Sequence, residues 1–452
     1  MRPFLKSYLR GEALYWFWGL LEKLVTAVGA FFILSELDVY KYGVYILLFS
    51  FYSLTAGIFL QPLQEVIFND LTRFAAAGKI AEAKRLFLEN WVVRMIFAVL
   101  LFLGLFFGAD LIARYYDQDI AGLFRLLSVL YFIDVSNTTI RMFLRFKLRF
   151  GLVAMRPMLF KIFRLAFILF FLSFFNFGIR EALISHLGAA FLATLVFVPA
   201  FIKEYRPWSR IKTAAQDFLL AQIIRRHGKW SIFGSSLSQL TGNIRPWLIK
   251  AFVNTEAVAI FSVAESLYGT VKAFFPDSTL MTLIPRKIAD RAAATAIFVR
   301  GTKYLTLLAL LMIAAGFFLA PPFIRWLLPH YAAALPFYQA LIILLLPIFA
   351  LRTMAVTFLV AWRRQKFLFF TGTVQTFGEI ILSIPFLYFF STWGMVWQRV
   401  LLSFVITVLL LNNLLKREFP TVSLRQFFVF DRLDKVFLKE FLVRFRRRFS
   451  LF

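Results

Sequence analysis

The sequence predicts an all-α, polytopic membrane protein with about twelve transmembrane helices, arranged as two pseudo-symmetric six-helix lobes around a central cavity. Its composition points to this class first: 61% of the 452 residues are hydrophobic, 17% are charged and the mean hydropathy is +0.77. Apolar runs of about 20 residues, the length that crosses a bilayer, then recur from end to end. A soluble domain of this length needs more polar surface, so a soluble enzyme is excluded.

The expected spans follow one another with short connectors, and their number is even. They lie near residues 13–34, 42–64, 91–112, 119–141, 157–176, 179–202, 229–252, 257–283, 304–327, 335–361, 367–390 and 394–415.

Charge alternates between these connectors and predicts the topology. The net charge is +27, and Lys and Arg gather in every second connector. The other connectors are poor in basic residues and include Glu36, Asp38 and Asp117. Because basic loops stay on the cytoplasmic side, both termini are predicted to be cytoplasmic. The basic residues serve this topology, so no nucleic-acid partner is expected.

An internal duplication is predicted at an offset of 216 residues. Tyr45 pairs with Phe261, and Phe177-Gly178 with Trp393-Gly394. Repeats of six spans return the chain to its starting side, so the pseudo-twofold axis should follow the membrane normal. The expected parts are an N-lobe at 1–202, a cytoplasmic interfacial connector at 203–227, a C-lobe at 228–417 and a basic amphipathic cytoplasmic tail at 418–452.

The connector and the tail both combine apolar and basic residues. In the connector, Trp208, Ile211 and Ile223 can share one apolar side. Helices of this kind lie on a membrane surface and are attracted to anionic lipids, which are therefore expected partners. A disordered basic end is the alternative for the tail.

Polar side chains inside the spans are the candidates for a substrate cavity. Ionisable groups are costly in hydrocarbon and are expected to face protein or a water-filled cavity. The candidates are Lys272, Arg352, Arg245, Asp134, Arg141, Glu265 and Asn243. The alternatives are that these groups pair to fix helix packing, or that cations near span ends snorkel to the surface. Snorkelling is the prediction for Lys161, Arg164 and Lys250.

Metal and catalytic chemistry have little support in this sequence. There is no cysteine and there are three histidines, so no metal site and no cofactor are expected. No hydrolase or transferase arrangement of residues occurs, and no catalytic residue is assigned. A coupling proton or sodium ion remains open, with Asp134, Glu265 or Glu379 as its carboxylate.

Four stretches resemble the Wzx-like polysaccharide flippases of the multidrug/oligosaccharidyl-lipid/polysaccharide (MOP) superfamily. They begin with SELDVYKYGVYILLFSF at 35–51 and NTEAVAIFSVAESLYGTVKAFFPDSTLMTLIPRKIAD at 254–290. LLPHYAAALPFYQALIILLLPIFALRTM at 327–354 and TGTVQTFGEIILSIPFLYFFSTWGMVWQRVLLSF at 371–404 complete the set. Ala259, where such proteins usually have Gly, and the 60 phenylalanines depart from the pattern.

The resemblance implies a lipid-linked (undecaprenyl-pyrophosphate) oligosaccharide as cargo, moved to the outer leaflet by alternating access. The product would be a cell-surface polysaccharide such as O-antigen, with a polymerase and chain-length machinery as further partners. Lys272, Arg352 and Arg245 would then counter the phosphate charge. Two alternatives stay open: a cation-coupled small-molecule exporter of the MATE type, and a membrane glycosyltransferase or ligase.

Overall fold

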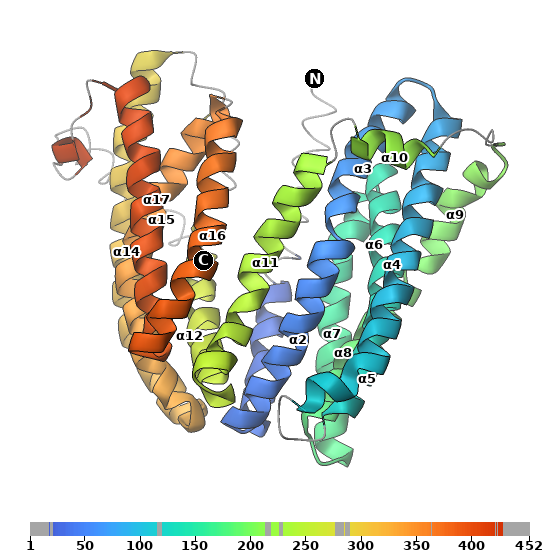
Figure 1. Cartoon of the computed structure of the whole chain (residues 1–452), viewed down its shortest axis with the longest axis horizontal. Helices are drawn as coiled ribbons and strands as arrows, with labels where there is room; N and C mark the ends of the chain where they lie inside the picture. Colours follow the sequence, from blue (N-terminus) through green and yellow to red (C-terminus); the bar gives the residue numbers. More distant parts are fainter. Residues whose placement is uncertain are drawn as a thin grey trace, which may run out of the picture. The chain divides into compact units, whose positions relative to one another are not determined.

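The computed structural model describes residues 18, 21–114, 120–212, 218–225, 229–275, 284, 290–362, 364–420, 422 and 424–427. Every regular element within these residues is helical, which confirms the all-α prediction (Figure 1). Three predicted features lie outside them: Asp117 in an outer connector, the eighth span beyond residue 275, and the tail from residue 428 onward.

The chain forms two compact units, residues 1–259 and 260–452. The first contains helical residues 21–36 and then α2 (Val39–Phe59), α3 (Pro62–Ala76), α4 (Ile80–Arg114), α5 (Ala121–Ser128), α6 (Leu130–Phe146), α7 (Phe150–Phe174), α8 (Ile179–Leu195), α9 (Val198–Ser209), α10 (Leu219–Ile223) and α11 (Lys229–Phe252). α12 (Thr255–Lys272) begins in the first unit. The second contains α14 (Arg291–Leu327), the 3-10 turn Pro329–Ala334, α15 (Leu335–Ala361), α16 (Gln365–Phe390), α17 (Thr392–Arg417) and a short 3-10 turn Leu424–Phe427.

These helices match the predicted spans in order along the chain. Within the described residues, eight are long and apolar enough to cross a membrane, and a ninth is obtained if α8 and α9, bent by 42°, form one span. The seventh span coincides with α11. α11 packs against α2 and α3 in the first unit, and the division into lobes at 203–227 stays a prediction.

A break between α2 and α3 gives the second span its shape. Pro62 has no N–H, so the Ile58 carbonyl cannot receive its usual helical hydrogen bond. Ser236 of α11 donates to that carbonyl instead, at 3.1 Å. The Leu60 carbonyl accepts from Arg94 Nε of α4, at 3.1 Å. Side chains from two other helices therefore satisfy the carbonyls freed at the break.

The connector after α8 is held by protein rather than lying free on a membrane. Trp208 at the end of α9 is 3% exposed and packs against Phe87 and Phe143. The Lys84 ammonium donates to the carbonyls of Ser209 and Ile211, the C-terminal end of α9, which favours positive charge. The predicted membrane-facing role of Trp208 is therefore wrong, because its ring fills the space between α4, α6 and α9.

One pair of helix ends shows the predicted repeat. α7 ends at Phe174 and α16 at Phe390, and 390 − 174 is the predicted offset of 216.

Aromatic rings fill one end of the second unit, where Phe298 stacks on Phe419 at 4.7 Å and also contacts Phe358. The start of the C-terminal tail is therefore part of this core.

Candidate functional site

A polar cavity of about 830 Å³ lies within the first unit, between α3, α6 and α7. It is lined by Gln61, Gln64, Phe68, Asn69, Asp134, Asn137, Thr138, Arg141, Met142, Arg145, Phe150, Val153 and Arg156. Its walls come from the polar faces of helices whose other faces are apolar. The site is thus a polar cavity, large enough for many water molecules, inside a membrane-spanning bundle.

One face of α6 supplies most of the charge. Asp134, Thr138, Arg141 and Arg145 follow one another at intervals of three or four residues, so they share a side of the helix. The sequence places Asp134 and Arg141 on one face, and the structure confirms that both line one cavity. Within the described residues they form no ion pair with each other, so both remain directed at the cavity.

The cavity is cationic. Its lining includes one carboxylate, Asp134, and three arginines: Arg141, Arg145 and Arg156. The net charge of these four side chains is +2. The Arg145 guanidinium also lies 4.5 Å from the centre of the Phe68 ring, an arrangement that holds the cation at the wall. Arginine presents several donors in a planar fork that suits phosphate and carboxylate groups.

A buried arginine supports the wall from behind. Arg94 of α4 is fully buried and donates to the Leu60 carbonyl and to Thr138 Oγ1. The Thr138 hydroxyl in turn donates to the Asp134 carbonyl at 2.7 Å. Arg94 therefore ties the α2–α3 break to the cavity face of α6.

Sequence reasoning missed Arg156. Its predicted place was the basic connector, because the fifth span was expected to begin at Pro157. Proline fits the first turn of a helix, but here Pro157 lies inside α7, which begins seven residues earlier. Arg156 therefore lies within the helix and lines the cavity. No helical spacing in the sequence marks this position, because it depends on α7 starting at Phe150 rather than at Pro157.

A family model described as "polysaccharide biosynthesis protein" matches residues 79–331, which is more than half of the chain. The chain belongs to this family. The match covers α4 to α14, and so includes the α6 and α7 walls of the cavity. No curated protein sequence matches the chain.

Solved structures share the fold of this polysaccharide biosynthesis family member at low identity. One is described as the inward-facing conformation of a multidrug resistance MATE family transporter of the MOP superfamily: 14% identity, TM-score 0.71, covering 89% of this chain and 96% of that one. Another is the lipid II flippase MurJ in an inward closed conformation: 13% identity, TM-score 0.73, covering 92% and 89%. These likenesses confirm that the chain has the membrane-transporter fold of these two structures.

The remaining candidates in the second unit form two hydrogen-bonded groups. Glu265 of α12 pairs with Arg399 of α17 at 2.5 Å, and the Arg399 guanidinium lies 5.6 Å from the Tyr268 ring centre. Arg352 of α15 donates to Gln375 of α16 at 2.5 Å. Gln375 donates onward to Glu379, at 2.9 Å. These contacts join neighbouring helices, as the pairing alternative expects.

Lys272 and the α11 candidates lie apart from those groups. Lys272 is the last residue of α12, and its ammonium lies 4.4 Å from the centre of the Phe349 ring. The eighth span beyond residue 275 lies outside the described residues, so the place of Lys272 within that span stays a prediction. Asn243 donates to the Gln239 carbonyl one turn earlier in α11, and Arg245 follows half-buried. A cavity shared by Lys272 and Arg352 stays a prediction.

Proposed function

We propose that this protein is a flippase that carries a lipid-linked oligosaccharide, on an undecaprenyl-pyrophosphate carrier, from the cytoplasmic to the outer leaflet. The observation that carries the proposal is the cationic cavity between α3, α6 and α7, in a chain of the polysaccharide biosynthesis family. The MurJ structure, which shares this fold, is described as that of a lipid II flippase. A cell-surface polysaccharide such as O-antigen would be the product.

The arginines suit the pyrophosphate. Arg141 of α6 and Arg156 of α7 line the same cavity from two neighbouring helices. Guanidinium groups pair with phosphate oxygens through two parallel hydrogen bonds, which are stronger than bonds between neutral groups. A balance of +2 would offset the diphosphate charge while the group is away from water.

The amides suit the sugars. Gln61, Gln64, Asn69 and Asn137 line the same cavity and each supplies donors and acceptors. Phe68 and Phe150 add ring faces on which the apolar side of a sugar can pack. Such a wall accepts many hydroxyl arrangements, which fits a carrier that handles an oligosaccharide.

The cavity lies toward the side that we propose to be cytoplasmic. Arg145 and Phe150 flank the basic turn at 147–149, one of the Lys- and Arg-rich connectors. Cargo assembled in the cytoplasm would enter there and leave after one lobe rocks against the other. Reporter fusions at Lys79 and Arg210 should report cytoplasm, and fusions at Asp117 and Tyr331 the outside.

A MATE-type exporter coupled to a proton or sodium ion is the second candidate, because the fold is shared with such transporters. It requires a carboxylate that gains and loses the ion. Glu265 pairs with Arg399, and Asp134 shares its cavity with three arginines. Glu379 accepts a hydrogen bond from Gln375. These carboxylates are held by cations and donors, which supports the flippase over the exporter.

The test uses proteoliposomes that contain the purified protein and a fluorescent undecaprenyl-pyrophosphate oligosaccharide. Transfer between leaflets is followed by quenching of the outer label. Arg141→Ala and Arg156→Ala should slow transfer, while Arg180→Ala, an exposed arginine on α8 of the same unit, should not. Transfer by both cavity variants at the wild-type rate would refute the proposal, and efflux of a cationic drug with no lipid transfer would support the exporter.

A further inference from the structure

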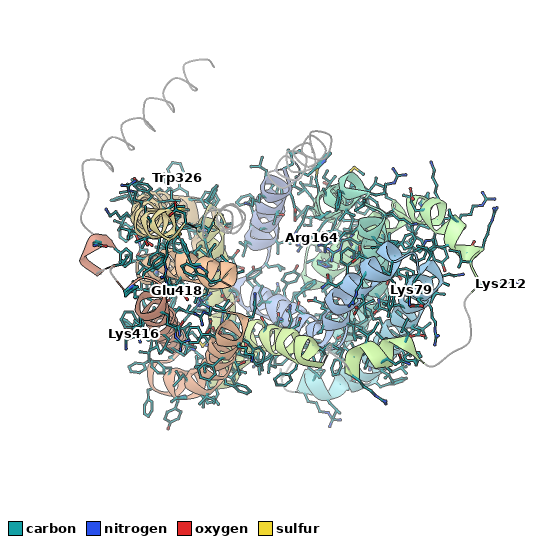
Figure 2. All side chains as sticks on the ribbon, turned by 90° about the horizontal axis from the view of Figure 1, so that it is seen from above. Lys79, Arg164, Lys212, Trp326, Lys416 and Glu418 are labelled. Atoms are coloured by element: carbon teal, nitrogen blue, oxygen red, sulfur yellow. The ribbon has the colours of Figure 1, made fainter. Side chains whose placement is uncertain are left out.

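A second, smaller pocket of about 290 Å³ lies in the first unit, among helical residues 21–36, α2, α7 and α8. Most of its lining is apolar, but Lys161, Arg164 and His186 also face it, together with the hydroxyl-bearing Tyr42 and Tyr45. α7 runs from Phe150 to Phe174, so Lys161 and Arg164 lie near its middle (Arg164 is labelled in Figure 2). The expectation that these two cations snorkel to a membrane surface is therefore wrong.

The two cations have few partners of opposite charge. Arg164 Nη2 donates to Tyr45 Oη at 2.5 Å, a neutral acceptor, and its buried Nε has no partner. The Lys161 ammonium lies 5.5 Å from the centre of the Phe160 ring. Within the described residues no carboxylate forms an ion pair with either cation. Glu22 acts on Lys161 from a longer distance, which leaves two cations against one carboxylate.

A histidine adds a further unsatisfied polar atom. The His186 ring packs against Phe49 at 4.6 Å and Phe160 at 5.0 Å. Its Nδ1 is buried and has no hydrogen-bond partner. The charges of Lys161 and Arg164 both act on this ring. Buried polar atoms without partners are uncommon, so a water or an ion bound in this pocket would satisfy Nδ1.

The fold itself does not require polar groups at these positions. At the 216-residue offset, Lys161, Arg164 and His186 correspond to three apolar residues of the second unit: Phe377, Ile380 and Leu402. Helices α16 and α17 pack there through apolar contacts, as when Leu402 meets Gly378. Charged groups in the membrane interior are costly, so cations at positions that are apolar in the other repeat indicate a function.

We propose that this pocket is an anion-binding site for a phosphate group, separate from the cavity between α3, α6 and α7. The Arg164 fork and the Lys161 ammonium supply charge-assisted donors, and the Tyr45 hydroxyl can donate while it accepts from Arg164. About 290 Å³ holds a phosphate group with water, since one water occupies about 30 Å³. A bound phosphate would neutralise the pocket and tie residues 21–36 to α2 and α7.

The experiment is equilibrium dialysis of radiolabelled inorganic phosphate against the purified full-length protein in neutral detergent. It compares the wild type with a pocket variant, Lys161→Gln/Arg164→Gln, and a cavity variant, Arg141→Gln/Arg145→Gln. The pocket variant should lose one class of phosphate site, and the cavity variant should keep it. Arg164→Lys, which retains the charge, should also keep it. Added phosphatidylglycerol distinguishes the source, since it displaces phosphate only if a lipid headgroup occupies the pocket.

Failure of this proposal is distinguishable from failure of the flippase. A pocket variant that binds as many phosphates as the wild type, with the same affinity, overturns the anion site whatever the cavity does. If the double variant does not fold, Tyr45→Phe decides the matter. It removes one donor and should weaken the pocket site roughly tenfold. If the folded Tyr45→Phe variant binds phosphate with the wild-type affinity, the proposal of an anion site in this pocket is overturned.

Discussion

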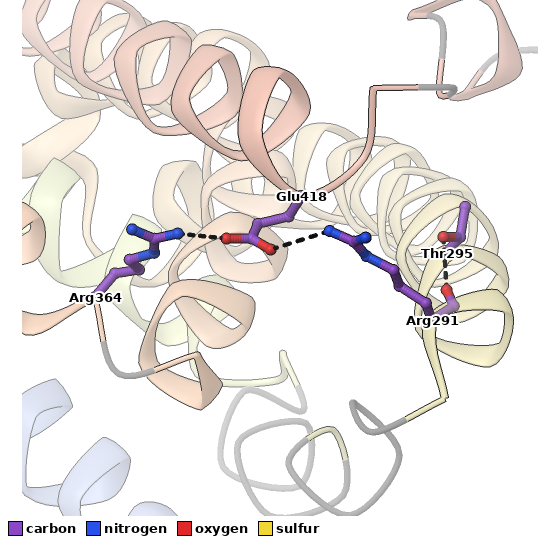
Figure 3. A network of polar contacts seen from close by, with 4 residues as sticks. All are labelled: Arg291, Thr295, Arg364 and Glu418. Atoms are coloured by element: carbon purple, nitrogen blue, oxygen red, sulfur yellow. Dashed lines mark hydrogen bonds and ion pairs between the residues drawn. The ribbon is translucent and has the colours of Figure 1, made fainter.

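The Glu418 carboxylate accepts a hydrogen bond of 2.7 Å from Arg364 and lies 3.9 Å from Arg291 (Figure 3). Arg364 precedes α16, Arg291 begins α14, and Glu418 follows the last residue of α17. One carboxylate therefore holds three helix ends of the second unit together, next to the buried Phe419 ring.

Glu418→Gln should lower the thermal stability of the purified protein. Glu418 is 15% exposed, but Arg364 is 38% exposed, so solvent screening limits the loss to about 1 kcal/mol. Arg364→Gln should cost about as much. Arg291→Gln is the matched control, because Arg291 is 74% exposed and its contact is long. Equal losses for Arg291→Gln and Arg364→Gln would contradict this account.

Arg94→Met should destabilise the first unit and lower the abundance of the protein in the membrane. The substitution leaves the Leu60 carbonyl and the Thr138 hydroxyl without their donor, at about 1–3 kcal/mol for each. Membrane abundance and thermal stability are the measurements. Arg114→Met, at the exposed end of the same helix, is the control. Normal abundance of Arg94→Met would show that Arg94 does not support the cavity wall.

Much of this architecture could be predicted because a membrane span is recognised from the hydropathy of its own residues. The seventh span and α11 coincide at residues 229–252, and the repeat offset recurs in the ends of α7 and α16. The placement of Asp134 and Arg141 on one face of a helix also follows from helical periodicity alone. These features need no knowledge of which helices touch.

The site was less predictable, because the direction of a charged side chain depends on neighbouring helices. The sequence predicts a helix start at Pro157, which leaves Arg156 in a connector, but α7 begins at Phe150. The same late start puts Lys161 and Arg164 near a predicted span end, so they are predicted to reach a membrane surface. Glu265 could not be matched with Arg399, 134 residues away, from sequence spacing. Arg94 lies inside the predicted span 91–112, and its hydrogen bonds to Leu60 and Thr138 depend on how α2, α4 and α6 pack together.

Lys272→Ala and Arg352→Ala should behave differently. Lys272 lies at the end of α12 over a ring, so its loss should reduce polysaccharide export and leave membrane abundance unchanged. Arg352 donates to Gln375, which donates to Glu379, so its loss removes a cation from a half-buried acidic network. The cost is up to about 3–5 kcal/mol, and abundance should fall. Abundance and export are measured together in a strain without its own flippase. Normal export by Lys272→Ala would remove Lys272 from the cargo path.

Gly43→Ala should disturb the contact between α2 and the start of α12. An added Cβ would lie 2.2 Å from the Thr255 carbonyl oxygen, which is backbone and cannot turn aside. The helices must separate locally, at about 1–3 kcal/mol. Gly104→Ala, where an added Cβ meets nothing within 4 Å, is the control. Thermal stability that is unchanged by Gly43→Ala would show that this approach is looser than described.

Asp38 should make the start of α2 sensitive to acid. Partial burial raises the pKa of the Asp38 carboxyl, but the hydrogen bond from Lys41 N and the Lys41 charge outweigh it, so the pKa lies below its ordinary value. A depressed carboxyl pKa adds stability above the unfolded pKa of about 3.9 and loses it as pH falls through the folded pKa. Hydrogen exchange in the first turn of α2 measures this directly. Wild type should exchange more slowly than Asp38→Asn at pH 7, and the difference should shrink as pH falls below about 3.9 and vanish below the folded pKa. Asn still caps a helix, so the comparison isolates the charge. A difference that persists in acid would mean that Asp38 stabilises α2 without its charge.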